Sequence, residues 1–207
     1  MKTNMHTNKN SIIATFLVAI LTLSPAFSFA QAATTFSGEA VALRASAVGI
    51  SLALADTGAL PSSGGSLSTS LASLNVLGLA SADALKSTTS GSGSSGQSQS
   101  SVADMSLLGG LVAAEVVKSN SSATCSSGQA TVTGNAEVVG LVAAGQSVLV
   151  SNPNLAISLP GGISLIVNEQ TISPSGNTGS ITVNALHVKG PSIDIVVASA
   201  QSGITCS

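Results

Sequence analysis

The chain has 207 residues, of which 44% are hydrophobic and 7% are charged, with a formal net charge of −2, no Trp, no Tyr and four Phe. Binding to nucleic acid requires a basic stripe, and binding to single strands also requires stacking aromatics, so this composition excludes both classes. The scarcity of charge and the abundance of Val, Leu, Ile and Ala argue against intrinsic disorder.

Residues 1–32 have the three-part pattern of a secretory signal peptide. Lys2 and Lys9 give a basic start, residues 12–23 are an unbroken apolar or small stretch, and small residues around residues 28–32 fit a cleavage site. The alternative is an uncleaved anchor, but this stretch is too short to cross a hydrocarbon core about 30 Å thick. The mature chain then carries four basic residues against eight carboxylates, a net charge of −4. We expect it to be secreted, extracellular or associated with the cell surface, and to contain no transmembrane segment.

The next part of the chain gives a mixed pattern. Residues 36–54 alternate small and apolar side chains, which predicts two strands. Residues 66–85 fit either a strand or a Leu/Ala helix, and periodicity does not decide between them. Residues 87–101 are a Ser/Gly-rich, low-complexity tract that contains no apolar side chain, so they are predicted to be a mobile loop or linker with nothing to bury.

A short repeat follows this tract. The sequence GLVAA occurs at residues 110–114 and again at residues 140–144. A period of this size can indicate a solenoid, so a β-solenoid-like stack is one alternative for the fold. Two similar strands of a sandwich explain the repeat equally well.

The C-terminal half is dominated by short segments rich in β-branched residues and bounded by turn formers. The last three, residues 164–170, 180–188 and 194–200, are joined by connections too short for a helical crossover, which predicts an antiparallel meander. Further strands are expected at residues 130–133, 137–139, 147–150 and 155–159. The strand spacing predicts a single all-β extracellular domain over residues 33–207, folded as an antiparallel β-sandwich.

Cys125 and Cys206 are the only cysteines. Export would bring them into an oxidising compartment, where a pair of cysteines in a secreted chain indicates a disulfide. We therefore expect a bond that fastens the C-terminus to the middle of the chain. An intermolecular bridge is the remaining alternative.

Four segments of the C-terminal half, LPGG at 159–162, IVNEQ at 166–170, ITVNALHV at 181–188 and IVVASA at 195–200, resemble the choice-of-anchor P family. These are bacterial secreted or surface proteins named for the varied C-terminal anchors that members carry. The resemblance covers mainly residues 130–200 and implies a bacterial, exported, extracellular domain, with no known catalytic residues to carry over. The sequence ends at Ser207 without such an anchor, which favours release, or retention through partners.

Glu169, His187 and Asp194 are the only candidates for a polar site, because they lie on three neighbouring predicted strands. A histidine with a carboxylate can bind a metal or support acid–base chemistry. Apolar residues occupy both faces of the strand that carries His187, so its direction is open, and a structural histidine is the favoured interpretation. No nucleophile elbow accompanies it, so a hydrolase or metal-dependent enzyme is the last-ranked alternative. We expect no catalytic residues, no metal site and no cofactor.

A surface with few charges and many Ser, Thr, Asn and Gln residues has little electrostatic repulsion to keep copies apart, and open sheet edges accept further strands. We expect a non-catalytic structural or adhesive component of the bacterial cell surface or biofilm matrix. It would associate with itself or with other matrix components as a fibre subunit using strand addition, and residues 34–46 are the expected donor strand. A polysaccharide-binding module is the alternative, ranked lower because Phe36 is the only aromatic residue after the signal peptide.

Overall fold

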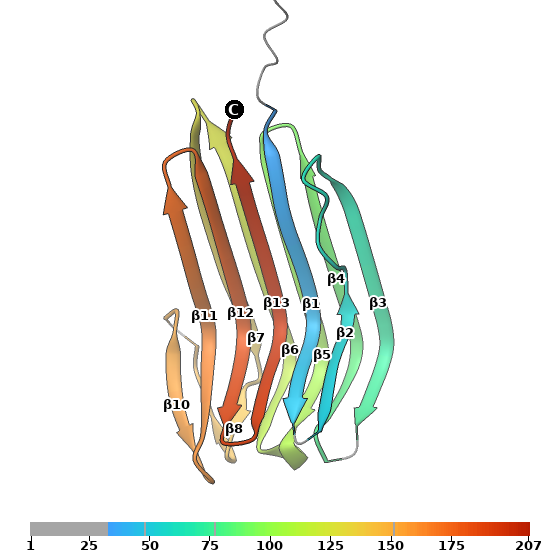
Figure 1. Cartoon of the computed structure of the whole chain (residues 1–207). Helices are drawn as coiled ribbons and strands as arrows, with labels where there is room; N and C mark the ends of the chain where they lie inside the picture. Colours follow the sequence, from blue (N-terminus) through green and yellow to red (C-terminus); the bar gives the residue numbers. More distant parts are fainter. Residues whose placement is uncertain (1–32, 48, 77, 151) are drawn as a thin grey trace, which may run out of the picture. The chain divides into compact units, whose positions relative to one another are not determined.

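A computed structural model describes residues 33–207 of the chain, apart from residues 48, 77 and 151 (Figure 1). The predicted signal peptide lies outside the described residues. No helix in the described part has the length and hydropathy of a membrane span. The described part is built from antiparallel strands, with a single turn of 3-10 helix at Leu108–Gly110.

The first sheet, sheet A, has six strands in the order β10-β11-β12-β13-β1-β2. All neighbouring strands in it are antiparallel. Their bounds in chain order are β1 Thr35–Ala47, β2 Ile50–Asp56, β10 Leu155–Leu159, β11 Ile163–Ser175, β12 Thr178–Gly190 and β13 Ile193–Thr205. The predicted C-terminal meander is therefore confirmed, as β11-β12-β13.

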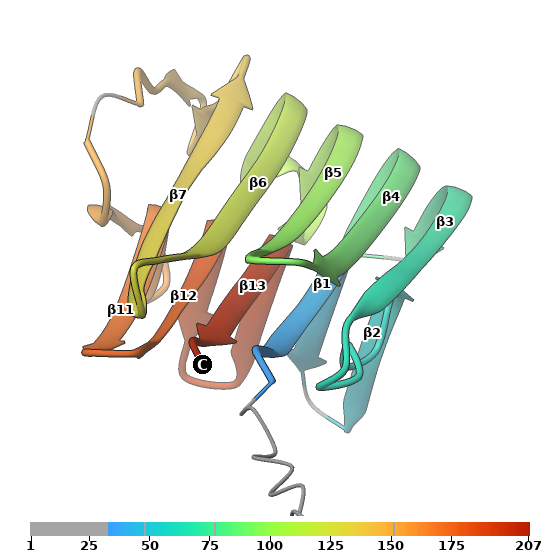
Figure 2. The ribbon, with the colours of Figure 1, turned by 90° about the horizontal axis from the view of Figure 1, so that it is seen from above.

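The second sheet, sheet B, has seven strands, with β3-β4-β5-β6-β8-β9 in order and β7 also paired with β6. Their bounds are β3 Gly65–Val76, β4 Ala80–Ser92, β5 Ser95–Leu107, β6 Val112–Ser126, β7 Gln129–Val139, β8 Val142–Ala143 and β9 Gln146–Ser147. Figure 2 shows the two sheets as two layers, with β7, β6, β5, β4 and β3 in one and β11, β12, β13, β1 and β2 in the other. The predicted antiparallel β-sandwich is confirmed.

The solenoid alternative is wrong. The two GLVAA copies do not stack as successive coils of a repeat. They lie at the start of β6 and around β8, where Val112 pairs with Ala143 and Ala113 pairs with Val142 in antiparallel register. The repeat thus reflects two apolar segments that pair with each other in one sheet.

The prediction of a mobile loop at residues 87–101 is also wrong, because this tract forms most of the β4–β5 hairpin. The undecided segment 66–85 is strand, divided between β3 and β4. The two short strands expected within residues 130–139 are one continuous strand, β7, and the strand expected at residues 147–150 is reduced to the two residues of β9. Residues 34–46 contain most of β1, which lies between β13 and β2 of its own sheet rather than being free to complete another.

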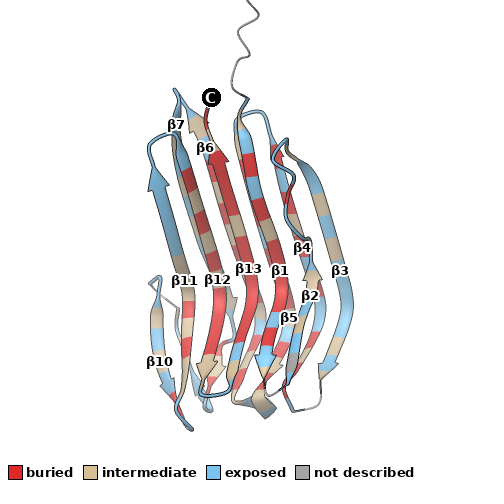
Figure 3. Ribbon diagram, in the orientation of Figure 1, coloured by how far each residue is buried: buried red, intermediate tan, exposed pale blue. Residues whose placement is uncertain are grey.

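Most of the core is apolar and lies between the two sheets. Its main cluster combines aliphatic residues from both layers, and in Figure 3 the buried positions of sheet A gather on β1, β12 and β13. Its largest fully buried members are Leu85, Leu107, Leu165, Leu186 and Ile195. Phe36 belongs to a second, smaller cluster with Leu60, Ala123, Ile204 and Cys206 at the opposite end of the sandwich. Burial of these aliphatic groups, about 0.8 kcal/mol per methylene, is the main force holding the layers together.

Between these two clusters the interior is lined by hydroxyl groups, which explains why the Ser-rich tract is ordered. The Thr89 and Ser98 hydroxyls are 2.7 Å apart, and Ser98 donates to the Gln201 carbonyl oxygen in the facing sheet at 2.5 Å. The Ser121 and Ser202 hydroxyls, also from opposite sheets, are 2.8 Å apart. Buried polar groups are tolerated when they bond to one another, so a strand without large apolar side chains can still face the interior.

The sheets come close together in this hydroxyl-lined zone. A Cβ atom added to Gly38 of β1 would collide with the Thr89 hydroxyl of β4. Glycine is therefore required at this position by the distance between the layers and not by its backbone conformation.

One row of residues that runs across sheet A shifts the alternation of inward and outward side chains in the strands that it crosses. Ala55, Ala198 and Asn168, on β2, β13 and β11, have positive φ values of 46°, 50° and 52°. They lie in one row across the sheet, with Ala42 and Ala185 of β1 and β12 between them, where the register omits a pair. In β13 the inward positions are consequently Ile195 and Val197 before the row, Ala198 in the row, and Ala200 and Ser202 after it. Such irregularities change which face a side chain occupies.

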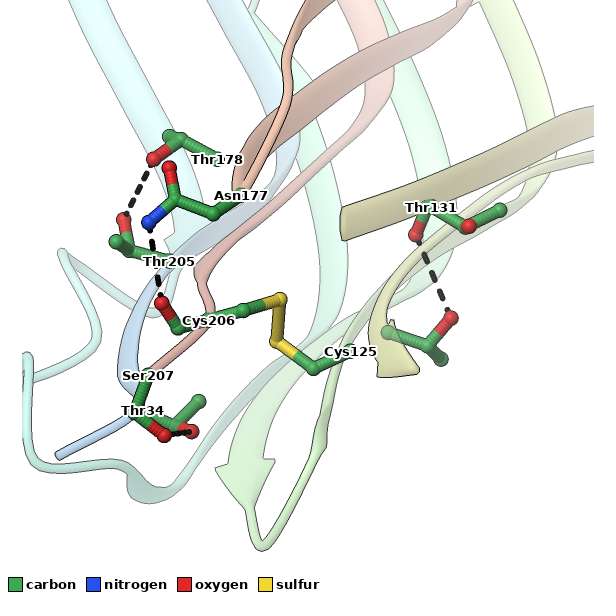
Figure 4. The surroundings of a disulfide bond; sticks show 9 residues. Thr34, Cys125, Thr131, Asn177, Thr178, Thr205, Cys206 and Ser207 are labelled. Atoms are coloured by element: carbon green, nitrogen blue, oxygen red, sulfur yellow. Dashed lines mark hydrogen bonds between the residues drawn. A yellow bond between two sulfur atoms is a disulfide. The ribbon is translucent and has the colours of Figure 1, made fainter. Parts of the chain in front are cut away.

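The expected disulfide is present and joins the ends of β6 and β13, which belong to opposite sheets (Figure 4). Cys125 and Cys206 are 81 residues apart in sequence. The carbonyl oxygen of Cys206 accepts a hydrogen bond of 3.2 Å from the Asn177 side chain, and its backbone N–H donates to the Asn177 carbonyl oxygen at 2.7 Å. The C-terminal end of the described chain is therefore fixed both covalently and by hydrogen bonds.

Candidate functional site

The structure brings the three predicted polar-site residues together on the outer face of sheet A. Glu169, His187 and Asp194 lie on the neighbouring strands β11, β12 and β13. His187 follows the row where the alternation shifts, so its neighbours Leu186 and Val188 point into the core and His187 points outward. It is nevertheless only 9% exposed, because side chains on the adjacent strands cover it.

Both ring nitrogens of His187 are occupied. Nδ1 lies 2.6 Å from Glu169 Oε2, and Nε2 lies 3.1 Å from Asp194 Oδ1. Glu169 Oε2 also accepts a hydrogen bond of 2.7 Å from the Asn184 side chain, and the Ser199 hydroxyl donates to Asn184 Oδ1 at 2.7 Å. These five residues form a continuous chain of hydrogen bonds across β11, β12 and β13, which we call the outer polar network.

The pKa of Glu169 is lowered by this environment. Partial burial is the largest single influence and raises the pKa, but the hydrogen bonds from Asn184 and His187 and the positive charges of His187 and Lys189 act in the opposite direction and together outweigh it. Lys189 Nζ is 3.4 Å from Glu169 Oε1. The carboxylate is thus held in its ionised form by its neighbours.

The geometry of the outer polar network fits a structural role better than a chemical one. Glu169 and Asp194 lie at opposite nitrogens of the imidazole, so the three side chains do not converge on one point that an ion could occupy. No group of three or more His, Cys, Asp or Glu residues among the described residues could hold a metal ion. The nearby hydroxyl, Ser199, donates to Asn184 and not to His187, so it lacks the contact with a base that activates a nucleophile.

A second polar surface lies on the outer face of sheet B, and sequence reasoning missed it. Residues that alternate with the buried hydroxyls of β4, β5 and β6, and with inward-facing Gly134 of β7, point away from the core. Eight of them form what we call the amide–hydroxyl face: Thr88, Ser90, Gln97, Gln99, Asn120, Ser122, Thr133 and Asn135. The usual sequence signal of a strand with one buried face is an alternation of apolar and polar residues. That signal is absent from the Ser-rich tract, because both its buried and its exposed positions are polar.

The strand register aligns these eight residues in two rows across four strands. One row runs Ser90, Gln97, Ser122 and Thr133, and the other runs Thr88, Gln99, Asn120 and Asn135. Two shallow hollows, of about 350 Å³ and 280 Å³, lie over these strands and share Gln99 and Asn120 in their linings. The face is therefore a depression lined by hydrogen-bonding groups.

The edges of the two sheets differ in how they are covered. β1 extends beyond the end of β2, and there the segment after β2 continues the pairing, with backbone bonds of 3.0 Å from Phe36 to Ser62 and 2.7 Å from Leu60 to Gly38. The edge of β11 is met by β10 and by the Asn154 side chain, which accepts from the Gln170 N–H at 2.9 Å. The Gly134 carbonyl oxygen of β7 accepts from the Gln170 side chain.

Strand β3 has a longer open edge than the terminal strands β2 and β10 of sheet A, which have seven and five residues. It is 12 residues long, pairs only with β4 among the described strands, and contains neither a charged residue nor a proline. Its outer backbone groups form the longest uncovered edge in the described part of the chain. Natural sheets usually protect such an edge with charge, proline, a bulge or a covering segment.

Comparisons of the chain with protein-family models, with curated proteins and with solved structures gave no match. The resemblance to the choice-of-anchor P family therefore stays a prediction from the sequence.

Proposed function

We propose that the protein is a non-catalytic structural or adhesive component of the bacterial cell surface or extracellular matrix, and that it associates with further copies of itself by strand addition. Export is supported by the signal-peptide pattern of residues 1–32, and the disulfide fits an oxidising compartment. A bacterial source rests on the family resemblance. The non-catalytic role is supported by the outer polar network, in which both nitrogens of His187 have structural partners.

The observation that carries the self-association is the open edge of β3. Unpaired N–H and C=O groups along a 12-residue strand can add a strand from another chain through main-chain hydrogen bonds. Leu67, Thr69 and Leu74 alternate with exposed Ser and Asn residues along it, so the edge has one partly apolar face and one polar face. The whole described chain also carries few charges, so little repulsion opposes the approach of a second copy.

The second copy can pair in two ways, and these give different assemblies. Antiparallel pairing of β3 with the β3 of another copy is two-fold symmetric and closes as a dimer with one continuous sheet. Pairing of β3 with a different edge of the next copy does not close and produces a filament. Both arrangements use the β3 edge, so one set of variants tests them together.

Charges placed on the β3 edge should weaken association. We expect the purified wild-type protein to form dimers or filaments with rising concentration, as measured by sedimentation velocity and negative-stain microscopy. The variant Ser68→Lys/Ser73→Lys should associate at least about tenfold more weakly, because lysines at an edge oppose strand addition. Ser73 lies opposite Asp83 and Ser68 opposite Thr88, so neither lysine meets a like charge within the sheet.

The matched control is Ser62→Lys/Ser63→Lys, which adds the same two charges in the exposed connection between β2 and β3. It should associate like the wild type. A wild-type protein that stays monomeric at the highest attainable concentration, or an edge variant that assembles as well as the control, would contradict the proposal.

A further inference from the structure

We propose that the amide–hydroxyl face of sheet B binds a neutral polysaccharide. The site consists of the two cross-strand rows on β4, β5, β6 and β7 and the two hollows that share Gln99 and Asn120 in their linings. It is independent of the β3 edge and goes beyond self-association, because it assigns the chemical class of a second binding partner.

The side chains of this face have unused hydrogen-bonding capacity. Within the described part of the chain, Gln97, Gln99, Asn120 and Asn135 make no side-chain hydrogen bond, whereas the five polar side chains of the outer polar network on sheet A are joined in a chain. Each amide offers two donors and one acceptor, and each hydroxyl offers one donor and accepts as well. Sugar hydroxyls have the same dual character, so either group can donate to the other.

The composition of the face argues against other partners. Protein interfaces are enriched in aromatic residues, Met and Arg and depleted in Ser, whereas this face contains no aromatic or aliphatic side chain. Small-molecule pockets are mainly apolar and enclosed, whereas these hollows are shallow and open and are lined by polar and charged residues with one glycine. A long neutral polymer remains, because it can gain affinity from many weak contacts along its length.

Charges around the face do not favour a polyanion. Lys86 and Lys118 lie in the lining of the larger hollow, but Lys118 Nζ is already 3.4 Å from Glu137 Oε2. Asp83, Asp104 and Glu115 are exposed on the same sheet beyond the two lysines. Since the carboxylates nearby outnumber the lysines, an acidic polymer would meet net repulsion.

The proposal is tested by affinity electrophoresis of the purified protein in native gels that contain dextran, galactomannan or a mixed-linkage β-glucan. Gels with alginate and with chitosan test the acidic and cationic alternatives. We expect retardation by at least one neutral polymer, little change in 0.5 M salt (roughly the range in which contacts between charges are screened), and tighter binding of longer oligosaccharides. Loss of two amides in Gln99→Ala/Asn120→Ala should weaken binding about tenfold.

The control variant Asn75→Ala/Gln146→Ala removes two exposed amides that lie off the face and should bind like the wild type. Asn120→Asp keeps the size of the side chain but removes its two donors, so it should also weaken binding while unfolding at the temperature of the wild type. Absence of retardation by every neutral polymer, retardation by alginate or chitosan alone, or wild-type binding by the double alanine variant would each overturn the proposal. The single edge variant Ser73→Lys, which lies opposite Asp83 and outside the two rows, should retain polysaccharide binding, and this separates failure of this site from failure of self-association.

Discussion

At the scale of single residues, the outer polar network shows how a histidine can be nearly buried on the outside of a sheet. His187 is held between a carboxylate on each neighbouring strand, and Asn184 extends the bonding from Glu169 to Ser199, the second residue of β13 in the network. Neighbouring strands are thereby tied through side chains as well as through the backbone. The network contains partly buried ionised groups whose hydrogen bonds depend on one another. Protonation of one member weakens the bonds of the others, so the stability that the network contributes should depend on pH.

The ionised form of Glu169 is expected to stabilise the folded protein at neutral pH. Its folded pKa lies below its ordinary value of 4.5, so the unfolded chain binds the proton first as the pH falls. The contribution is fully present above the unfolded pKa, and it is lost as the pH decreases from about 4.5 through the folded pKa. In urea unfolding followed by circular dichroism, Glu169→Gln should therefore differ most from the wild type at neutral pH, and the difference should shrink in acid.

Glu137→Gln is the matched control for this measurement. Its side chain is 53% exposed and paired with an exposed lysine, an arrangement that contributes little to stability. It should follow the wild type across the whole pH range. A constant difference between Glu169→Gln and the wild type from neutral to acid pH would show that ionisation of Glu169 does not contribute.

At the scale of strands, the hydroxyl-lined zone is the least expected feature of the fold. β4, β5 and β6 place hydroxyls inward where a sandwich normally has large aliphatic side chains, and the facing strands contribute Gly38 and Ser202. Small side chains allow the sheets to approach, and mutual hydrogen bonds remove the cost of burying the hydroxyls. The same serine content that resembles a linker in sequence is thus compatible with a buried strand.

Two serines on β6 provide a direct test of this explanation. Ser121 bonds across the layers to Ser202, whereas Ser119, two positions earlier and fully buried, has the only buried side-chain oxygen or nitrogen without a partner among the described residues. We expect Ser121→Ala to lower the free energy of unfolding by about 1 kcal/mol and Ser119→Ala to leave it unchanged or raise it. Urea unfolding of both variants measures this. Equal losses in the two variants would mean that the hydroxyl pairs do not stabilise the interior.

At the scale of the whole described domain, the disulfide supplements a core made largely of small side chains. It joins β6 of one sheet to β13 of the other across 81 residues of sequence. The chain-entropy relation gives about 4 to 5 kcal/mol for a loop of this length. The bond also lies beside the small cluster of Phe36 and Ile204, so it holds together the end of the sandwich that is farthest from the main apolar cluster.

Removal of the disulfide should therefore destabilise the protein substantially. We expect Cys125→Ser/Cys206→Ser to unfold with a free energy about 4 kcal/mol below that of the oxidised wild type. Reduction of the wild type should give a similar loss, and reductant should have no effect on the double variant. A loss below about 1 kcal/mol, measured by urea unfolding under both conditions, would show that the sheets are held together without it.

Sequence alone identified the strand-rich C-terminal meander, the disulfide pair and the three residues that meet around His187. These features depend on local signals: β-branched runs with short connections, a lone cysteine pair, and polar residues on adjacent strands of a meander. These features could be predicted without knowing which residues of the opposite sheet pack against them.

Only the tertiary structure decided the direction of His187, the order of residues 87–101 and the existence of the amide–hydroxyl face. The direction of His187 depends on the row of positive-φ residues, which shifts the alternation and leaves no clear sequence signal. The Ser-rich strands are ordered by hydroxyl partners and a glycine that lie up to 104 residues away or on another sheet. The alternation of polar residues becomes informative only when one face is buried, and for this tract the facing sheet determines which face that is.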